Sequence, residues 1–347
     1  MKGKLLAAST EKLVWAEQFG NGCGHGPHEG CPRATGKPLG GERGRAPHER
    51  TLRESMVGSI MRGIGSFYTV LCDEDGQEYT LRAQKKLRHQ KMTPMVGDRV
   101  RFTPGEGEDN GWLEEILPRK SVMLRPSVAN CDMLMLVVAS VPHPDMLLID
   151  KLILRAAKGN MTPAICVNKI DLGDELVASI REEYAGTQLR VFAASALTGE
   201  GVETLRDAMR GKVTCLAGQS AVGKSSLLNA IFGLELETGG LSRKTERGRH
   251  TTRRSEMMAV DGMLVLDTPG FSLLEIEDGV EPQDFAQMYP EYNELAGDCR
   301  FQPCLHDREP GCAVHAAVDA GKLSAVRWAR YRELLAEVKE NWKGRYV

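Results

Sequence analysis

The segment 218–225, with the sequence GQSAVGKS, constrains the fold of this chain more than any other. It matches the pattern G-x-x-x-x-G-K-[S/T], in which backbone N–H groups turn inward around phosphate oxygens. A strand-like apolar run, 213–217, precedes it and a helix-like run, 224–232, follows it, which is the context that such a loop requires. We therefore expect a phosphate site at the start of a helix. Its residues are Gly218, Gln219, Ser220, Ala221, Val222, Gly223, Lys224, Ser225 and Ser226.

Two side chains of this loop have predicted roles in holding a nucleoside triphosphate. Lys224 should reach the β- and γ-phosphates, and Ser225 should ligate Mg²⁺. A second motif, D-T-P-G, ends the apolar run 263–266. Its Asp267 can hold Mg²⁺ through water, and its Gly270 can offer an N–H to the γ-phosphate. Downstream of a phosphate loop, this motif indicates a magnesium–nucleotide site.

The glycine-bearing, basic segment 238–254 lies between these two motifs and is expected to be a mobile switch. Thr252 or Thr251 should cap Mg²⁺ and the γ-phosphate. Many GTPases place a glutamine after the D-T-P-G position to orient the attacking water, but here that residue is Phe271. A phenyl ring cannot orient water, so hydrolysis without a partner should be slow. His250 is the candidate catalytic side chain, with a solvated or RNA-facing role as the alternative.

A base-reading motif, N-K-I-D, ends another buried strand and contains Asn168, Lys169 and Asp171. A carboxylate accepts bonds from the N1 and N2 edge of guanine, whereas adenine offers no such pair of donors. The lysine stem can lie over the ring, and the asparagine can tie loops together. The next strand ends at S-A-L, where a backbone N–H can meet the guanine O6. These residues are Ser195, Ala196 and Leu197.

The order of the motifs is unusual. In ordinary small GTPases the phosphate loop comes first, whereas here N-K-I-D and S-A-L precede the phosphate loop and D-T-P-G follows it. A circular permutation keeps every strand in place while it moves the termini. The loop after Asp267 then leads into the C-terminal cysteine segment, so nucleotide state could move that segment as a unit.

The C-terminal segment carries a metal-binding pattern. Three cysteines and one histidine within fourteen residues suit a closed, tetrahedral, structural Zn²⁺ site. Its ligands are Cys299, Cys304, His306 and Cys312, with His315 as a nearby substitute for His306. A second group near the N-terminus lies in a glycine-rich context without a core, and we expect adventitious or no metal binding there. That group is Cys23, His25, His28 and Cys31.

Composition along the chain predicts four parts. Residues 1–55 read as a mobile Gly/His/Arg-rich tail, and residues 56–118 as the short strands of a small RNA-binding β-barrel such as an OB-fold. Residues 119–290 alternate strands with helices, which predicts an α/β P-loop domain with a mostly parallel sheet covered on both faces. Residues 291–347 hold the cysteine cluster and then a helix, which together predict a zinc-binding α-helical domain.

Two further patterns suggest surfaces. A basic stretch in the barrel predicts either a solvated surface or a nucleic-acid face; it contains Arg82, Lys85, Lys86, Arg88, His89 and Lys91. An apolar stripe on the last helix is expected to dock the tail onto the sheet domain; it contains Trp328, Tyr331, Leu335, Val338 and Trp342.

Composition also bears on the compartment. The chain has 347 residues, a formal net charge of −2 and nine cysteines. No uninterrupted apolar stretch is long enough to span a bilayer, and the N-terminal apolar run is too short for a signal peptide. Four cysteines sit singly in strand-like runs, where a buried hydrophobic role is expected: Cys72, Cys131, Cys166 and Cys215. We therefore expect a cytoplasmic protein, and a monomer.

Over residues 56–345, this set of motifs resembles the bacterial RsgA (YjeQ) family of circularly permuted GTPases. The similarity rests on the motif order, the G-R-H-T-T run at 248–252, D-T-P-G-F, and the Cys/Cys/His/Cys spacing. The resemblance implies an N-terminal OB-fold, a permuted GTPase domain and a C-terminal zinc-binding domain. It also implies binding to the small ribosomal subunit and its rRNA, help in its late maturation, and GTP hydrolysis to GDP stimulated by that particle. The tail at 1–55 departs from the family pattern.

Two other functions stay open at this point. A P-loop kinase or ATPase acting on a small molecule is one, although Asp171 argues against it. An RNA-binding nucleotide sensor without significant multiple turnover is the other. Nucleotide competition separates the first from a GTPase, and phosphate release over many turnovers separates the second.

Overall fold

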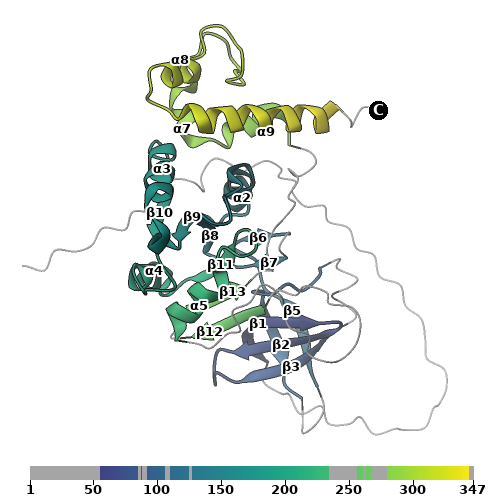
Figure 1. Ribbon diagram of the computed structural model, residues 1–347. Helices are drawn as coiled ribbons and strands as arrows, with labels where there is room; N and C mark the ends of the chain where they lie inside the picture. The colour runs from purple at the N-terminus through teal and green to yellow at the C-terminus, as the bar shows by residue number, and fades with distance from the viewer. Residues whose placement is uncertain are drawn as a thin grey trace, which may run out of the picture. The chain divides into compact units, whose positions relative to one another are not determined.

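The computed structural model describes part of the chain, all of it within the unit Glu54–Val347 (Figure 1). The described residues are 55–84, 87, 92–105, 110–124, 127–233, 256–260, 263–267 and 280–343. The predicted tail, most of the basic stretch and the group at positions 23–31 lie outside them. None of the described helices is long and apolar enough to cross a membrane.

The N-terminal strands close into a five-stranded barrel in the order β1-β2-β3-β5-β4, as expected for a small β-barrel. Alternate side chains point inward because successive residues of a strand face opposite sides. Val70, Leu81 and Phe102 are fully buried in this way. The strands are β1 (Met56–Ile64), β2 (Phe67–Cys72), β3 (Glu78–Ala83), β4 (Arg99–Thr103) and β5 (Gly111–Ile116).

The barrel joins the following domain through a small apolar junction. A two-stranded ribbon, β6 (Val122–Met123) and β7 (Val128–Ala129), follows the barrel. Met61 of β1 and Val96 belong to the same buried cluster as the core of the sheet domain. Nearby, the buried Asp98 carboxylate accepts bonds from the Arg119 guanidinium at 2.7 and 2.8 Å.

The central domain is a six-stranded sheet in the order β10-β9-β8-β11-β13-β12. Five strands run parallel, as predicted, and the edge strand β12 runs antiparallel to β13. The strands are β8 (Met133–Ala139), β9 (Thr162–Asn168), β10 (Arg190–Ala193), β11 (Val213–Ala217), β12 (Glu256–Val260) and β13 (Met263–Asp267).

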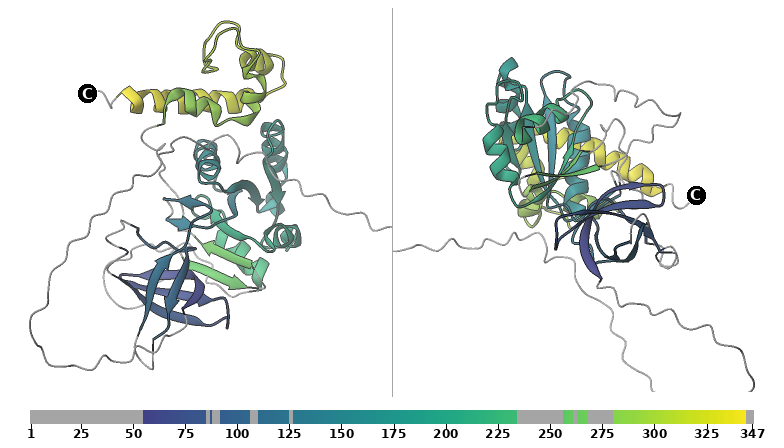
Figure 2. Two further views of the ribbon diagram at one scale, coloured as in Figure 1. Left: turned by 180° about the vertical axis from the view of Figure 1, so that it is seen from behind. Right: turned by 90° about the horizontal axis from the view of Figure 1, so that it is seen from below.

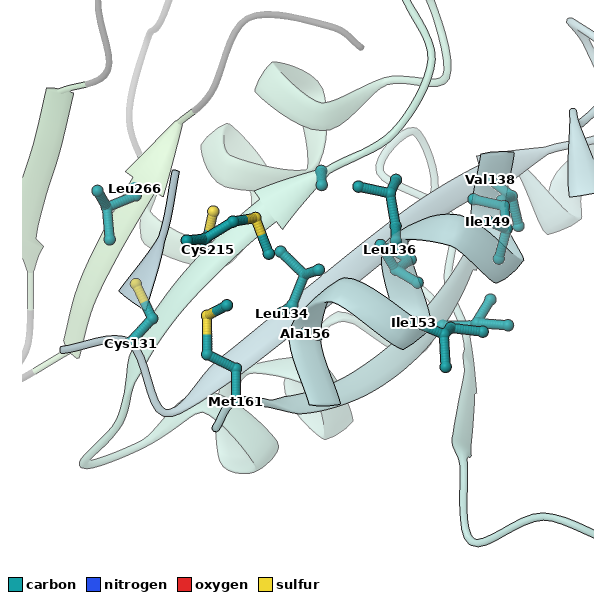
Figure 3. Packing of buried hydrophobic residues seen from close by; sticks show 14 of the residues in the cluster. Cys131, Leu134, Leu136, Val138, Ile149, Ile153, Ala156, Met161, Cys215 and Leu266 are labelled. Atoms are coloured by element: carbon teal, nitrogen blue, oxygen red, sulfur yellow. The ribbon is translucent and has the colours of Figure 1, made fainter. Parts of the chain in front are cut away.

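Helices cover both faces of this sheet (Figures 1 and 2). Successive side chains of a strand point to opposite faces, so strand β8 is buried throughout because helices cover both faces. Leu134, Leu136 and Val138 point toward α2 (Figure 3). Met133, Met135 and Val137 face α4 and α5. The helices are α2 (Met146–Lys158), α3 (Glu175–Glu183), α4 (Val202–Met209) and α5 (Lys224–Phe232).

The buried cysteines behave as small hydrophobic side chains, as expected. Cys72, Cys131, Cys166 and Cys215 are all at most 2% exposed. Burial raises the pKa of both the Cys131 and the Cys166 thiol to about 12. These thiols therefore stay protonated at neutral pH and are poor nucleophiles.

The C-terminal module has an aromatic core. Phe285, Tyr289, Tyr292 and Tyr331 are at most 1% exposed, and their ring centroids lie 4.8–5.6 Å apart in stacked and edge-on pairs. The helices are α6 (Pro282–Gln287), α7 (Pro290–Ala296), α8 (Ala313–Asp319) and α9 (Ala325–Lys343).

The predicted stripe on α9 packs differently from expectation. Tyr331, Leu335 and Val338 are buried, but mainly against the module's own core. From the sheet domain, only α2 contributes described residues to this cluster, namely Leu154 with Leu147 beside it. The stripe is thus mostly an internal face of the module, where Tyr331 packs on Phe285 of α6 and on Tyr289 and Tyr292 of the α7 region.

A buried group of charges makes the main polar contact between α9 and the sheet domain. The Asp150 carboxylate of α2, 2% exposed, accepts bonds from Arg327 at 2.8 Å and Arg330 at 2.5 Å. It also accepts the Tyr184 hydroxyl at 2.6 Å. Arg327 in turn pairs with Glu291 at 2.7 Å. We call Asp150, Tyr184, Glu183, Glu291, Arg327 and Arg330 the α2–α9 charge cluster.

Candidate functional site

Four sequence motifs meet at one edge of the sheet. The strands β8, β9, β10, β11 and β13 are parallel, so their carboxyl ends lie together. Asn168 pairs with the last residue of β8, and Asp267 pairs with Leu216 near the end of β11. Ligands of open α/β sheets bind outside the carboxyl ends of the strands. The permuted order therefore still assembles one site.

The phosphate loop runs very close to neighbouring backbone, and this requires its glycines. Gly218 has φ +145°, and a Cβ there would lie 2.2 Å from the Val137 carbonyl oxygen. Gly223 has φ +93°, and a Cβ there would lie 2.4 Å from the Asn168 amide nitrogen. Any larger residue at either position would push the loop away from β8 or β9.

Lys224 opens α5 and folds back over the loop. Its ammonium group donates to the carbonyl oxygens of Gly218 at 2.9 Å and Gln219 at 2.8 Å. The residue is 9% exposed, so the charge is held above the loop rather than in bulk solvent. Ser225 and Ser226 follow in the first turn of α5, where helix N–H groups favour an anion.

Asn168 links the base motif to both neighbouring loops. Its side-chain N–H donates to the Val222 carbonyl of the phosphate loop at 2.9 Å. Its side-chain oxygen accepts the Ala196 N–H at 3.1 Å. The residue is 1% exposed, so both bonds are shielded from water. This one amide therefore ties the loop 218–225 to the loop 195–197, the linking role expected of an asparagine at this position.

Lys169 makes a second link and adopts a left-handed backbone conformation with φ +63°. Its ammonium group donates to the carbonyls of Ala221 at 2.8 Å and Val141 at 2.7 Å. The ammonium group therefore links the N-K-I-D loop to the phosphate loop and to the segment after β8.

Asp171 is exposed, and its orientation is set by Ser195. The fully buried Ser195 hydroxyl donates to the Asp171 carboxylate at 2.5 Å and accepts the Thr198 N–H at 3.2 Å. Leu197, in the same loop, is 84% exposed. The carboxylate is therefore presented at the protein surface by a fixed partner.

The predicted hydrolytic residues lie largely outside the described residues. His250, Thr251, Thr252 and Gly270 are not among them. The backbone of Asp267 ends β13 beside β11, at the edge expected of it. The structure thus describes the residues predicted to bind phosphates and base, and it does not describe those predicted to position the water.

One link at this edge was missed by the sequence analysis. The Gln219 side-chain oxygen accepts the Asp145 backbone N–H at 3.0 Å. Asp145 also caps α2, because its carboxylate accepts the Leu148 N–H at 3.0 Å. An aspartate directly before an apolar helical pattern predicts a helix N-cap. The sequence therefore already contained the signal for the capping role of Asp145.

The four predicted metal ligands come together in the C-terminal module. The ligand atoms of Cys299, Cys304, His306 and Cys312 all lie within 4.8 Å of one another, and each residue is at most 8% exposed. The His306 Nδ1 lies 3.7 Å from the Cys299 sulfur and 3.5 Å from the Cys312 sulfur. A tetrahedral zinc site with Zn–S near 2.3 Å and Zn–N near 2.0 Å separates N and S ligands by about 3.5 Å. The cluster therefore fits Zn²⁺.

Backbone N–H groups donate hydrogen bonds to three of these sulfurs and would stabilise negative charge on them. The N–H groups of Ala313, His306 and His315 donate to the sulfurs of Cys299, Cys304 and Cys312 at 3.3–3.5 Å. Without a metal, burial raises the pKa of the Cys304 thiol to about 12 and lowers the pKa of His306. A bound cation would reverse the thiol shift, because coordination requires thiolates.

His315 does not join the cluster. Its ring stacks on Trp328 with centroids 4.9 Å apart, and its Nε2 lies 3.7 Å from the Asp319 carboxylate. His306 supplies the imidazole instead, from a left-handed conformation with φ +55°. The suggested substitution of His315 for His306 is therefore not how this cluster is built.

Comparisons with known proteins agree with this arrangement. A scan of protein families matches residues 116–277 to the family described as RsgA GTPase and residues 57–113 to the RsgA N-terminal domain. The chain is 41% identical to the small ribosomal subunit biogenesis GTPase RsgA of Geobacillus thermodenitrificans, over 83% of this chain and 99% of that protein. It is 39% identical to the protein of the same name from Ruminiclostridium cellulolyticum, over 83% and 96%.

Two solved structures are similar. The crystal structure of YjeQ from Thermotoga maritima has a TM-score of 0.69 and 34% identity, covering 82% of this chain and 99% of that one. The structure of YloQ, described as a circularly permuted GTPase, has a TM-score of 0.68 and 31% identity, covering 86% and 98%. The permuted strand order inferred from the motifs therefore has crystallographic relatives.

Proposed function

This chain belongs to the RsgA family of GTPases, and from that premise we propose that it hydrolyses GTP to GDP and phosphate while it assists maturation of the small ribosomal subunit. GTP would favour the form bound to the subunit, and hydrolysis would favour release. The subunit would stimulate hydrolysis, because Phe271 cannot orient the attacking water.

The nucleotide part of this proposal rests on the two hydrogen bonds that the Asn168 side chain makes. One buried amide holds the phosphate loop at 2.9 Å and the base loop at 3.1 Å. A site that checks the base and the triphosphate together needs such a rigid span. Asp171, oriented by Ser195, would then read guanine.

In the reaction, a water oxygen bonds to the γ-phosphorus while the bond from that phosphorus to the β–γ bridging oxygen breaks. Lys224 would stabilise charge on the β- and γ-phosphates, and the amides of residues 218–225 would surround the β-phosphate. Ser225 and Thr252, or Thr251, would hold Mg²⁺, which supplies further charge neutralisation when bound. His250 is our candidate for positioning the water.

The remaining parts of the proposal concern the chain's state. The described cysteines form no disulfide, which is consistent with a reducing cytoplasm. We propose that one structural Zn²⁺ holds the C-terminal module and that the protein acts as a monomer. Sedimentation equilibrium and metal analysis of the purified protein would test both points.

Co-sedimentation tests the ribosomal part. Purified small subunits, with large subunits as the control, are centrifuged with the protein in the presence of a non-hydrolysable GTP analogue or of GDP. We expect pelleting with small subunits that is stronger with the analogue, and faster phosphate release from GTP in their presence. Equal pelleting with both nucleotides, together with unstimulated hydrolysis, would contradict the proposal.

A further inference from the structure

The C-terminal module exposes one aromatic ring where it buries the others. Phe301 lies in the short loop 300–303 between the ligands Cys299 and Cys304 and is 47% exposed. The core rings of the module, such as Tyr292 and Tyr331, are at most 1% exposed. The ring of Phe301 therefore does not contribute to the module's core.

The loop that carries this ring is held from several sides. The Arg300 N–H donates to the Gly311 carbonyl at 3.0 Å, and the Gln302 side-chain amide donates to the Ala296 carbonyl. Gly311 has φ +74°, and a Cβ there would lie 2.9 Å from the Arg300 Cβ. A ring on such a loop loses little conformational freedom when a ligand covers it.

A cation stands beside the exposed ring. The Arg300 guanidinium carbon lies 5.4 Å from the Phe301 ring centroid, within the range of a cation–π contact. Within the part of the chain that the structure describes, Arg300 forms no ion pair with a carboxylate. Arg308, on the same module, has a side chain that is 84% exposed.

The neighbouring acids are largely occupied by partners of their own. The Asp307 carboxylate pairs with Arg332 at 2.9 Å and with Lys339 at 3.0 Å. The Glu309 carboxylate accepts backbone N–H groups at 2.9–3.1 Å, from Leu305, Asp307 and Arg308. The exposed Asp298 is the acid nearest in sequence to Arg300. Arg300 is thus available for an anionic partner, whereas Arg308 also contacts the Asp307 carboxylate, at 4.0 Å.

This combination fits a nucleic acid better than a protein partner. The fully buried centre of a protein interface is more apolar than the rest of the surface, whereas the loop residues around Phe301, namely Arg300, Gln302 and Pro303, are exposed and include no second large apolar side chain. A nucleobase needs only one flat face to stack on, with a cation nearby for the phosphate. Unpaired bases offer that face, whereas bases inside a helix are already stacked.

We propose that Phe301 stacks on an unpaired base of single-stranded RNA, with Arg300 beside it contacting the phosphate of the same nucleotide. The zinc cluster's part is to hold the loop, and the stacking ring is the contact. This deepens the proposed function and rests on it, since it names the chemistry by which the module would hold rRNA.

The test uses the full, zinc-loaded chain and an eight-nucleotide RNA of uridines with one central 2-aminopurine, whose fluorescence falls when it stacks. Phe301→Leu keeps an apolar side chain but removes the ring, and Phe301→Trp enlarges the ring. Val326→Ala is the matched control, because Val326 is 61% exposed on the same module. Zinc content is measured for every variant.

We expect Phe301→Leu to weaken binding by about 5- to 150-fold, since base–aromatic stacking contributes about 1–3 kcal/mol per base. Phe301→Trp should bind at least as well as the natural chain, and Val326→Ala should bind equally. An eight-nucleotide RNA made only of abasic nucleotides should bind the natural chain and Phe301→Leu alike, because it has no base to stack. Arg300→Gln should lower the dependence of log affinity on log salt by about one contact, which Phe301→Leu should not do.

Two results would overturn the proposal. One is unchanged RNA affinity and quenching in Phe301→Leu with full zinc content. The other is RNA affinity equal in all variants while Phe301→Leu alone loses small-subunit binding, which would assign the ring to a ribosomal protein. If Phe301→Leu loses zinc, Phe301→Trp decides, because weaker binding by that zinc-loaded variant also overturns stacking. The RNA assay contains neither GTP nor ribosomes, so a failure of subunit-stimulated hydrolysis is read separately.

Discussion

Neutralising Asp150 should loosen the C-terminal module more than any exposed charge change. Its carboxylate is 2% exposed and holds two guanidinium groups, of Arg327 and Arg330, that are themselves mostly buried. Asp150→Asn keeps the shape but leaves these cations short of one negative charge. Breaking a buried ion pair from one side costs about 3–5 kcal/mol, so we expect a loss of about that size in the free energy of unfolding.

Urea denaturation of the zinc-loaded protein, followed by tryptophan fluorescence, measures this loss, since Trp328 and Trp342 both lie on α9. With a urea dependence of about 1–3 kcal/mol per molar, the midpoint of the transition should fall by about 1 M or more. Asp207→Asn is the control, because Asp207 and its partner Arg210 are 60% and 64% exposed. That exposed pair should contribute less than about 1 kcal/mol.

A second substitution distinguishes charge from packing. If the cost comes from unpaired buried cations, Asp150→Asn combined with Arg330→Met should cost less than the sum of the two single changes, because the pair between these two residues can be lost only once. Equal losses for Asp150→Asn and Asp207→Asn would refute the reasoning. So would a double variant that is destabilised by the full sum of the two single changes.

Three further predictions concern the ligands. Asp171→Asn should exchange guanine preference for xanthine preference, measured by competition between GDP and XDP, and unchanged preference would remove the base assignment. Asn168→Ala removes two buried bonds, each worth about 1 kcal/mol, and should weaken GDP binding by about tenfold or more in calorimetry, with retained affinity as the contrary result. Zinc affinity, measured by chelator competition, should rise with pH between 6 and 8 by at least about tenfold per unit. Burial raises the pKa of the Cys304 thiol and lowers the pKa of the His306 imidazole, so zinc binding must release thiol protons. A zinc affinity that is independent of pH would contradict this.

Motifs with a mechanism could be read from the sequence because their chemistry is local. The phosphate loop needs glycines at 218 and 223 for close backbone approach, and the structure places Val137 and Asn168 against those positions. The Cys/Cys/His/Cys spacing likewise brought four ligands within 4.8 Å. The permuted order also followed from the sequence, because parallel strands bring their carboxyl ends together in whatever order the chain visits them.

Contacts between distant segments could not be read in this way. Asp150 pairs with residues about 180 positions later, and no local period reports that pairing. The helix α2 has two buried faces, one on the sheet and one at Leu147, Asp150 and Leu154. An apolar helical stripe predicts only the first face. A lone acid within an apolar helix was the available signal, since buried carboxylates require cationic partners.

The most direct test of the central claim is a calorimetric titration of the folded, magnesium-supplied protein with GDP and, separately, with ADP. If Asn168 joins the loops that hold phosphates and base, and Asp171 reads that base, GDP should bind at one site per chain and ADP should bind far more weakly. Equal affinity for the two nucleotides would contradict the account of this site.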